Sequence, residues 1–183
     1  LFFIKGNHDA WSGAGDPLDW ILKDPPGIVE PFGARLQISM PGTDRCLRIN
    51  VRHNFPGLSQ WNRAHAVAKA AQLGGSCHIY AAGHLHFSGY QTGKNPETGL
   101  QWHALQVGSY KIYDRYAEEK NLPDHNLFSC ATAIIDPHAS NEVQFIRFIF
   151  GDVEFAADLL NWMRKRWEAG KSYDSAPGLC AGF

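Results

Sequence analysis

The sequence has little net charge and no long apolar run. Its 17 basic and 18 acidic residues give a formal net charge of −1 over 183 residues. This balance provides no electrostatic field that would recruit nucleic acid, and there is no basic block or arginine-rich tail, so any contact with nucleic acid has to be local. No apolar stretch approaches the roughly 20 residues of a membrane-spanning helix, and no signal peptide is recognisable. We therefore expect no membrane association.

Cysteine is scarce and dispersed. The four cysteines, Cys46, Cys77, Cys130 and Cys180, form no Cys-x-x-Cys pair. Cys77 and Cys130 fall inside apolar runs, where free thiols are commonly buried. This pattern favours reduced, buried thiols in a cytoplasmic protein over a disulfide framework.

The remaining composition is that of a globular domain. Hydrophobic residues make up 44% of the chain and aromatic residues 13%, which is enough to bury one sizeable core. We expect one domain over residues 1–170 and an irregular tail over 171–183, where no periodicity is found. Leu1 already lies inside an apolar strand pattern, and partner strands are expected to precede such a strand. We therefore interpret the chain as the carboxyl-terminal part of a longer protein.

Three predicted strands end in polar residues that suit a metal site. The apolar run 1–4 is typical of a fully buried parallel strand, and a Gly-Asn-His-Asp sequence follows it over 6–9. The alternating segment 47–52 ends at His53, and the apolar run 77–82 is followed by Gly-His-Leu-His over 83–86. Imidazole nitrogens and amide oxygens both bind borderline divalent ions, and strands fix the positions of such ligands. For the opening stretch alone, an ordinary strand and turn remains the alternative.

The rest of the chain alternates between helix and hairpin patterns. We expect helices from Asp16-Pro17, over 59–74 with Ser59 as N-cap, within 110–120, and from Asp152 to Glu168. Hairpins are expected for 35–40 with 47–51, 87–92 with 100–107, and 128–135 with 142–150. The first hairpin should have one wet face, which carries Arg48, Asn50 and Arg52. The segments 47–52, 59–74 and 77–82 form a strand, helix and strand crossover. The predicted fold class is therefore α/β, with two stacked mixed sheets flanked by helices.

Several residues near the strand ends have structural interpretations that we favour over functional ones. Arg52 is expected to point outward into solvent or a salt bridge, and not to clamp a phosphate. Asn62 and His65 could overhang the site, but residues of this kind more often form the polar face of a helix. Trp61 is interpreted as a packing residue and not as a base-stacking platform. The histidines whose spacing joins no metal set, interpreted as structural or surface residues, are His65, His78, His103, His125 and His138.

In its order and context, Gly-Asn-His-Asp over 6–9, then His53, then Gly-His-Leu-His over 83–86 resembles the motifs of the calcineurin-like metallophosphoesterases. The resemblance covers residues 6–86. It implies a sandwich of two mixed β-sheets flanked by helices, with a two-metal site on loops at the strand ends. The metals would be divalent ions such as manganese, zinc or iron. The implied ligands are Asn7, His53 and His84 for one ion and His86 for the other.

The same resemblance implies roles for His8 and Asp9. His8 would protonate the leaving group, and Asp9 would orient its ring. Two ions roughly 4 Å apart would clamp a phosphoester and share an activated hydroxide that attacks phosphorus. Neighbouring side chains of an extended backbone point in opposite directions, so Asn7 can face metal while His8 faces substrate. In this family, Asp after Asn-His is familiar in phosphodiesterases and nucleases, whereas protein phosphatases usually carry Glu there, and Arg where Lys5 stands. Phosphodiesters are therefore the expected substrates.

The family pattern also requires an Asp-x-His and a Gly-Asp-x-x-Asp motif before the Asn, and the six residues before Asn7 cannot hold them. These motifs supply the bridging carboxylate and further ligands of the first metal. We therefore expect residues 1–183 to be catalytically incompetent and to bind at most one metal firmly. Two function classes follow: a metal-dependent phosphoester hydrolase, and a non-catalytic interaction or assembly module with a remnant metal site. His8, which serves only chemistry in the family scheme, favours the hydrolase.

Overall fold

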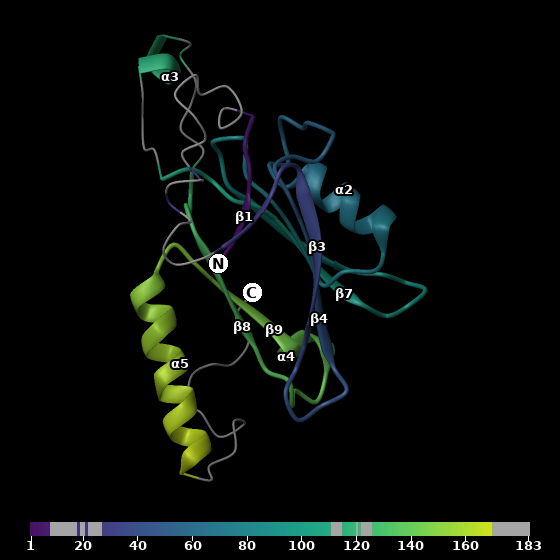
Figure 1. Ribbon diagram of the computed structural model, residues 1–183. Helices are drawn as coiled ribbons and strands as arrows, with labels where there is room; N and C mark the ends of the chain where they lie inside the picture. The colour runs from purple at the N-terminus through teal and green to yellow at the C-terminus, as the bar shows by residue number, and fades with distance from the viewer. Residues whose placement is uncertain are drawn as a thin grey trace.

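The fold is built on a five-stranded mixed sheet. The structure is a computed structural model that describes residues 1–7, 18, 21, 27–110, 115–119, 121 and 126–169. Figure 1 shows the sheet at the centre of these residues. Its strand order is β3 (Gly33–Ser39), β4 (Cys46–Arg52), β5 (Ile79–Ala82), β7 (Gln101–Gln106) and β6 (Gly89–Lys94).

The middle of the sheet is parallel because a helix returns the chain from β4 to β5. β5 pairs in parallel with both β4 and β7, as the predicted crossover requires. The crossover helix is α2 (His65–Gly74), which ends where Gly75 adopts a left-handed φ of 58° and bonds its N–H to the Ala71 carbonyl. The predicted apolar stripe packs against the sheet, and its buried residues are Ala64, Val67, Ala68 and Ala71.

The start of α2 lies later than the sequence predicts. The Ser59 hydroxyl accepts hydrogen bonds from the N–H groups of Trp61 and Asn62, and so closes a separate turn before the helix. Asn62 Oδ1 then accepts the Ala64 N–H at 2.9 Å. The prediction that Trp61 packs is also wrong, because its side chain is 95% exposed.

Two antiparallel hairpins flank the parallel centre, as predicted. β3 pairs with β4, with Leu36 opposite Ile49, and β6 pairs with β7. The expected wet face of the first hairpin is wrong at Asn50, which is only 5% exposed. Asn50 neighbours Tyr80 on β5, and Tyr80 belongs to the cluster packed under α2. The helix therefore covers a face that the alternating pattern alone would leave in water.

The opposite face of the sheet is covered by a second, two-stranded sheet. β8 (Ala131–Ile135) and β9 (Ile146–Phe150) pair in antiparallel fashion. A cluster of Leu47, Ile79, Leu105, Phe145 and Ile146 joins this pair to the five-stranded sheet. The second hairpin was predicted to resume as strand at 142, but 142–145 form the short helix α4 (Glu142–Phe145), because Asn141 Oδ1 accepts the Gln144 N–H at 3.0 Å.

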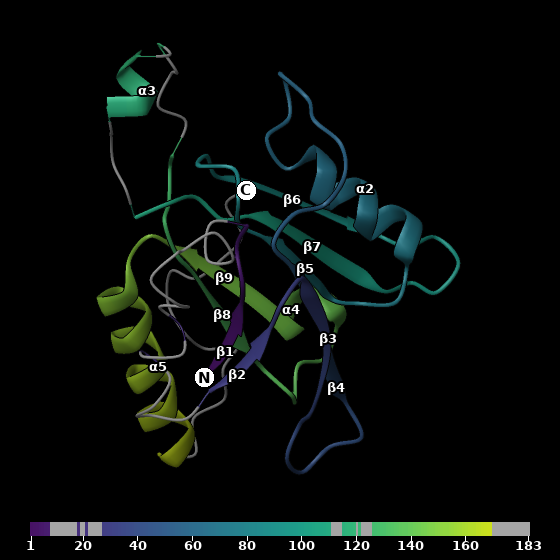
Figure 2. The ribbon, with the colours of Figure 1, turned by 45° about the horizontal axis from the view of Figure 1, so that its top comes forward.

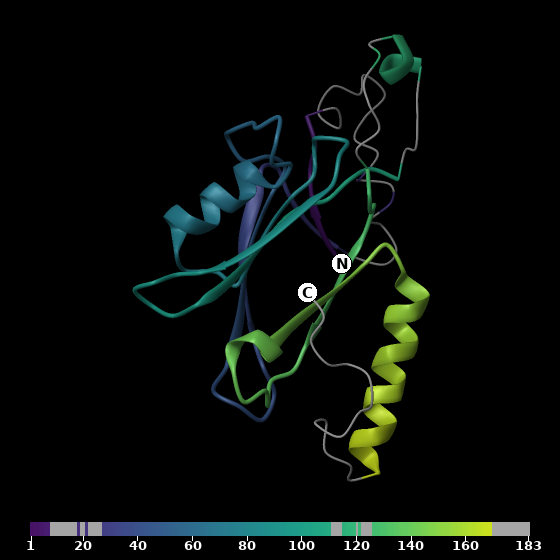
Figure 3. The ribbon, with the colours of Figure 1, turned by 180° about the vertical axis from the view of Figure 1, so that it is seen from behind.

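The carboxyl-terminal helix α5 (Val153–Glu168) forms the outer layer. Asp152 Oδ1 accepts the Phe155 N–H at 2.7 Å, which confirms the predicted N-cap. Figure 3 shows α2 and α5 on opposite sides of the strands, so the layers run helix, five-stranded sheet, two-stranded sheet, helix. This arrangement is a mixed α/β fold.

The opening strand is less buried than predicted. Among the described strands, β1 (Phe2–Ile4) pairs in parallel only with β2 (Ile28–Glu30), in a separate two-stranded sheet. All three β1 residues are half-buried and Leu1 is 71% exposed. The parallel pairing is as expected, but the strand is half-buried where full burial was expected. Figure 2 shows β1 between the five-stranded sheet and α5.

Several predictions fall on the margins of the described residues. The helix α3 (Arg115–Glu119) lies within the predicted segment 110–120. Of the helix expected from Asp16-Pro17 only Leu18 and Ile21 are described, and both are helical. The tail 171–183 and Cys180 lie outside the described residues. The other three cysteines are free, but only Cys77 is buried, while Cys46 and Cys130 are half-buried. Among the described helices, none has the length and apolar character needed to cross a membrane.

Candidate metal centre

Three of the predicted metal ligands meet beside the carboxyl ends of β4 and β5 in the five-stranded sheet. Nε2 of His53 lies 3.0 Å from Oδ1 of Asn7. The rings of His53 and His84 meet edge to face, with centroids 4.5 Å apart and an interplanar angle of 68°. Asn7 and His53 are half-buried and His84 is exposed. The three side chains therefore form a cluster that is open to solvent on one side.

Strand pairing explains why these residues meet. β4 and β5 run in parallel, so His53 and His84, which follow them, lie at the same edge. β2 connects Asn7 to this place. β1, which precedes Asn7, pairs with β2, and the carbonyl of Phe32, two residues after β2, accepts the His53 N–H at 3.2 Å. Residues 46 positions apart in the sequence are thereby held in contact.

The loop after β5 is tightly bent. His84 has a φ of 64°, a left-handed conformation that is uncommon outside glycine, although histidine tolerates it better than most residues. The N–H groups of Leu85 and Phe87 bond to the carbonyls of Gly83 and Leu85, both at 2.7 Å. In an extended backbone, His84 and His86 would point in the same direction and crowd one ion. The two turns bend the loop between them.

Gln106, which the sequence analysis does not single out, holds this loop in place. It ends β7 and is 1% exposed. Its Nε2 donates to the carbonyls of Gly83, Ala82 and Leu85, the last two at 3.3 and 3.5 Å. A signal was present, because Gln106 continues the alternation of the buried residues Trp102 and Ala104. A glutamine at a buried position needs polar partners, and here the loop carbonyls provide them.

Of the other predicted site residues only His86 is described, and it does not join the cluster. His86 lies on the same loop with an exposed side chain, and within the part of the chain that the structure describes it makes no hydrogen bond or ring contact. The predicted acid His8 and its partner Asp9 lie outside the described residues.

The donor set of the cluster fits a borderline divalent ion. Two imidazoles and one amide oxygen suit manganese, zinc or iron better than calcium, which prefers oxygen ligands alone. Oδ1 of Asn7 and Nε2 of His53 are already close enough for both to contact one ion at bond lengths of about 2.1 Å. No group of three or more histidine, cysteine, aspartate or glutamate side chains in the described ranges could hold a metal. The candidate centre therefore depends on Asn7 as its third ligand.

Two further histidines are structural, as predicted. His78 is buried, and its Nδ1 accepts the Arg48 N–H at 3.0 Å. His103 is 3% exposed, and its Nδ1 lies 2.7 Å from the Tyr90 hydroxyl oxygen. Burial lowers the pKa of His78, with a further contribution from the Arg48 charge, and lowers the pKa of His103 to about 4. Both rings are neutral near pH 7 for this reason.

The residues that could have flanked the site are placed as follows. Arg52 is exposed, with its guanidinium 5.9 Å from the Phe55 ring centroid, in agreement with the expected outward orientation. Asn62 donates to Gln91 Oε1 at 2.8 Å. His65 is exposed at the start of α2.

Comparison of the chain with protein-family models, with curated proteins and with solved structures gave no match. The function of the chain is therefore inferred from the geometry of the site and from the motifs that supply its residues.

Proposed function

We propose that the chain forms part of a metal-dependent phosphoester hydrolase of the calcineurin-like metallophosphoesterase type, and that its substrates are phosphodiesters. The observation that carries the proposal is the meeting of Asn7, His53 and His84, which follow three different strands. Each of the three motifs is common alone, but a chance match would not require their side chains to converge. The two stacked sheets with outer helices are compatible with the sandwich of that family.

In the proposed site the chain supplies ligands, a positioning residue and an acid. Asn7, His53 and His84 would hold one divalent ion, and His86 would contribute to a second. The ions would supply charge neutralisation at phosphorus and would activate water for attack. Gln106 would keep His84 facing the other ligands by fixing the carbonyls of its loop. His8 would give a proton to the departing oxygen, with Asp9 orienting the ring.

Metal binding by residues 1–183 is the first test. After dialysis against manganese or zinc, elemental analysis should find close to one ion per chain. His84→Gly should abolish this binding and leave the fold intact, because glycine adopts the positive φ of this position freely. His138→Ala is the matched control, since His138 is an exposed histidine that stacks on Trp167 elsewhere on the surface. A stoichiometry near zero with both metals would contradict the proposal.

Activity is the second test, made with the protein produced from its native gene. We expect hydrolysis of bis-p-nitrophenyl phosphate in preference to p-nitrophenyl phosphate, and loss of turnover in His8→Ala and His84→Gly. A strong preference for the monoester would refute the phosphodiester assignment. For residues 1–183 alone we expect no turnover, because the described cluster contains no bridging carboxylate.

The second candidate is a non-catalytic interaction or assembly module that keeps a remnant metal site. It is favoured by the absence, among the described residues, of a carboxylate beside the two imidazoles. The two candidates differ in one outcome: the module would bind metal through the same three residues, but the native gene product would show no phosphoester hydrolysis that depends on His8.

A further inference from the structure

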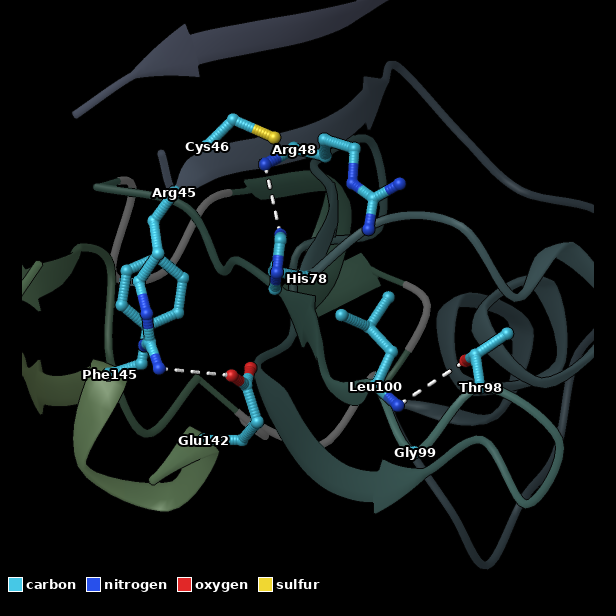
Figure 4. A pocket seen from close by; sticks show the side chains of 9 residues that line it. All are labelled: Arg45, Cys46, Arg48, His78, Thr98, Gly99, Leu100, Glu142 and Phe145. Atoms are coloured by element: carbon cyan, nitrogen blue, oxygen red, sulfur yellow. Dashed lines mark hydrogen bonds and ion pairs between the residues drawn. The ribbon is translucent and has the colours of Figure 1, made fainter. Parts of the chain in front are cut away.

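A second polar site lies at the opposite end of the sheet from the candidate metal centre. A cavity of about 330 Å³ opens where β4 and β5 begin, and Figure 4 shows its lining. β4 and β5 run in parallel, so the length of these strands separates the cavity from His53 and His84. The lining residues that carry charge or bulk are Arg45, Arg48, His78, Leu100, Glu142 and Phe145.

Two arginines that line the cavity carry buried hydrogen-bond donors without acceptors. Within the described residues, Nη1 of Arg45 and Nε of Arg48 are buried and have no hydrogen-bond partner. Leaving such a donor unpaired costs roughly 1–3 kcal/mol, and more for a charged group. The His78 ring is neutral and accepts the Arg48 N–H at Nδ1, which leaves its hydrogen on Nε2 as a further donor. Three of the side chains that line the cavity therefore carry N–H groups.

The charges in the cavity favour an anion. Arg45 and Arg48 each carry a positive charge, and Glu142 is the one carboxylate among the described residues of the lining. Glu142 Oε1 lies 3.5 Å from Nη2 of Arg45, so it satisfies neither of the two unpaired atoms. The lining keeps an excess of one positive charge, because two guanidinium groups face one carboxylate.

The remaining wall is apolar. Cζ of Arg45 lies over the Phe145 ring, 5.0 Å from the ring centroid. The Phe145 and His78 rings meet edge to face, with their centroids 5.4 Å apart. Figure 4 shows Leu100 on the other side, below Arg48. The volume is at the lower end of the range of roughly 300–1,000 Å³ for small-molecule pockets.

We infer that this cavity binds a small organic oxyanion. Its carboxylate or phosphate group accepts hydrogen bonds from Arg48 and Arg45, and its apolar body lies against Leu100 and Phe145. The site is independent of the metal centre and of the proposed hydrolase activity. The competing explanation is internal: Asn50 Oδ1 is also buried without a partner two residues along β4, and a turn of the Arg48 side chain toward it would pair both groups without any ligand.

The test uses residues 1–183 after metal has been removed by chelation and dialysis, so that binding of a probe to metal at the candidate metal centre cannot contribute to the signal. Benzoate and phenylphosphonate are titrated by calorimetry at constant ionic strength set with sodium chloride, and they distinguish a carboxylate ligand from a phosphate ligand. We expect one site per chain for at least one of the two probes. Arg48→Met should weaken this binding at least about tenfold, since charge-assisted hydrogen bonds are lost. Arg35→Met is the matched control, because Arg35 is exposed on the neighbouring strand β3 and should leave the affinity unchanged.

A substitution that should tighten binding distinguishes recognition in the cavity from a response to the net charge of the protein. Glu142→Gln frees the Arg45 guanidinium from its ion pair and should tighten binding several-fold. Glu119→Gln removes the same charge from an exposed ion pair with Arg115 on α3 and should have no effect. Equal tightening in both variants would mean a response to net charge alone, and would overturn the assignment.

The proposal also fails if neither probe binds better than chloride, or if Arg48→Met binds as the wild type does. Both results are what pairing of Arg48 with Asn50 predicts. If Arg48→Met does not fold, Leu100→Trp decides the question, because it fills the cavity and leaves every charge in place. It should abolish binding, and retained affinity would refute the site.

Discussion

Replacing His103 by leucine should remove a large part of the acid sensitivity of the fold. His103 lies on β7 with 3% of its surface exposed, between the Tyr90 hydroxyl at 2.7 Å and the Phe148 ring at 5.2 Å. Burial lowers its pKa from 6.5 to about 4, and the nearby His78 contributes in the same direction. In the native state the ring therefore stays neutral at a pH where the unfolded chain already binds a proton.

The sign and size of the effect follow from this difference in proton binding. Because the pKa is depressed in the folded state, the contribution of His103 is fully present above its unfolded pKa of 6.5 and is lost as the pH falls toward 4. The free energy of unfolding should fall by about 2 kcal/mol between pH 7 and 5 through this residue alone, at 1.36 kcal/mol per pKa unit.

Urea denaturation of the wild type and of His103→Leu at several pH values in this window measures the effect. Leucine lowers the stability at pH 7 through lost packing and the lost Tyr90 bond, but the readout is the slope with pH, which should flatten by about 2 kcal/mol over the window. His138→Leu, a replacement of the same kind at an exposed position, serves as the control. An unchanged slope in His103→Leu would show that the ring is not held neutral by burial.

Three further substitutions test the supports of the fold and the metal centre. Gln106→Leu removes the donor to the loop carbonyls and should weaken manganese or zinc binding by roughly tenfold or more, at a stability cost of about 1 kcal/mol; wild-type affinity would deny Gln106 its positioning role. Asp152→Ala should lower the free energy of unfolding by about 1 kcal/mol in urea denaturation, because Asp152 caps α5; no loss would mean that the cap is not formed in solution. Gly75→Ala should cost about 1–2 kcal/mol in the same assay because of its left-handed φ, and a neutral result would contradict the end assigned to α2.

Local signals were enough to predict most of the regular structure. The hairpin of β3 and β4 and the Asp152 cap are each specified within a few residues of sequence, by alternation or by a capping side chain. The wrong predictions occur where contacts with distant segments determine the local structure. Asn50 was assigned to a wet face because nothing in β4 itself indicates that α2 lies over it. Ser59 has the chemistry of an N-cap, but a turn before α2 uses it.

The meeting of the three candidate ligands was predictable, but the contacts that support them were not. Asn7, His53 and His84 each follow a strand, so the parallel pairing of β4 with β5 and of β1 with β2 was sufficient to bring them to one place. The alternation along β7 indicates that Gln106 is buried, but the carbonyls that it contacts were not predictable, since a single glutamine at the end of an apolar strand does not identify its acceptors. The positions of these carbonyls depend on the left-handed turn at His84, and no local sequence signal predicts that turn.

The two polar sites share β4 and β5, yet their positions argue against coupling between them. Coupling requires an element with two arrangements that both ligands bias. β5 is paired on both sides, by β4 and β7, and Leu47 and Ile79 near the strand starts are buried in the cluster beneath β8 and β9. Strands fixed in this way by ladders and by packing on both faces have no second arrangement close in energy. Experiments on the metal-free protein would therefore test the proposed anion cavity alone, and a substitution at either end of these strands would test one proposed site without disturbing the other.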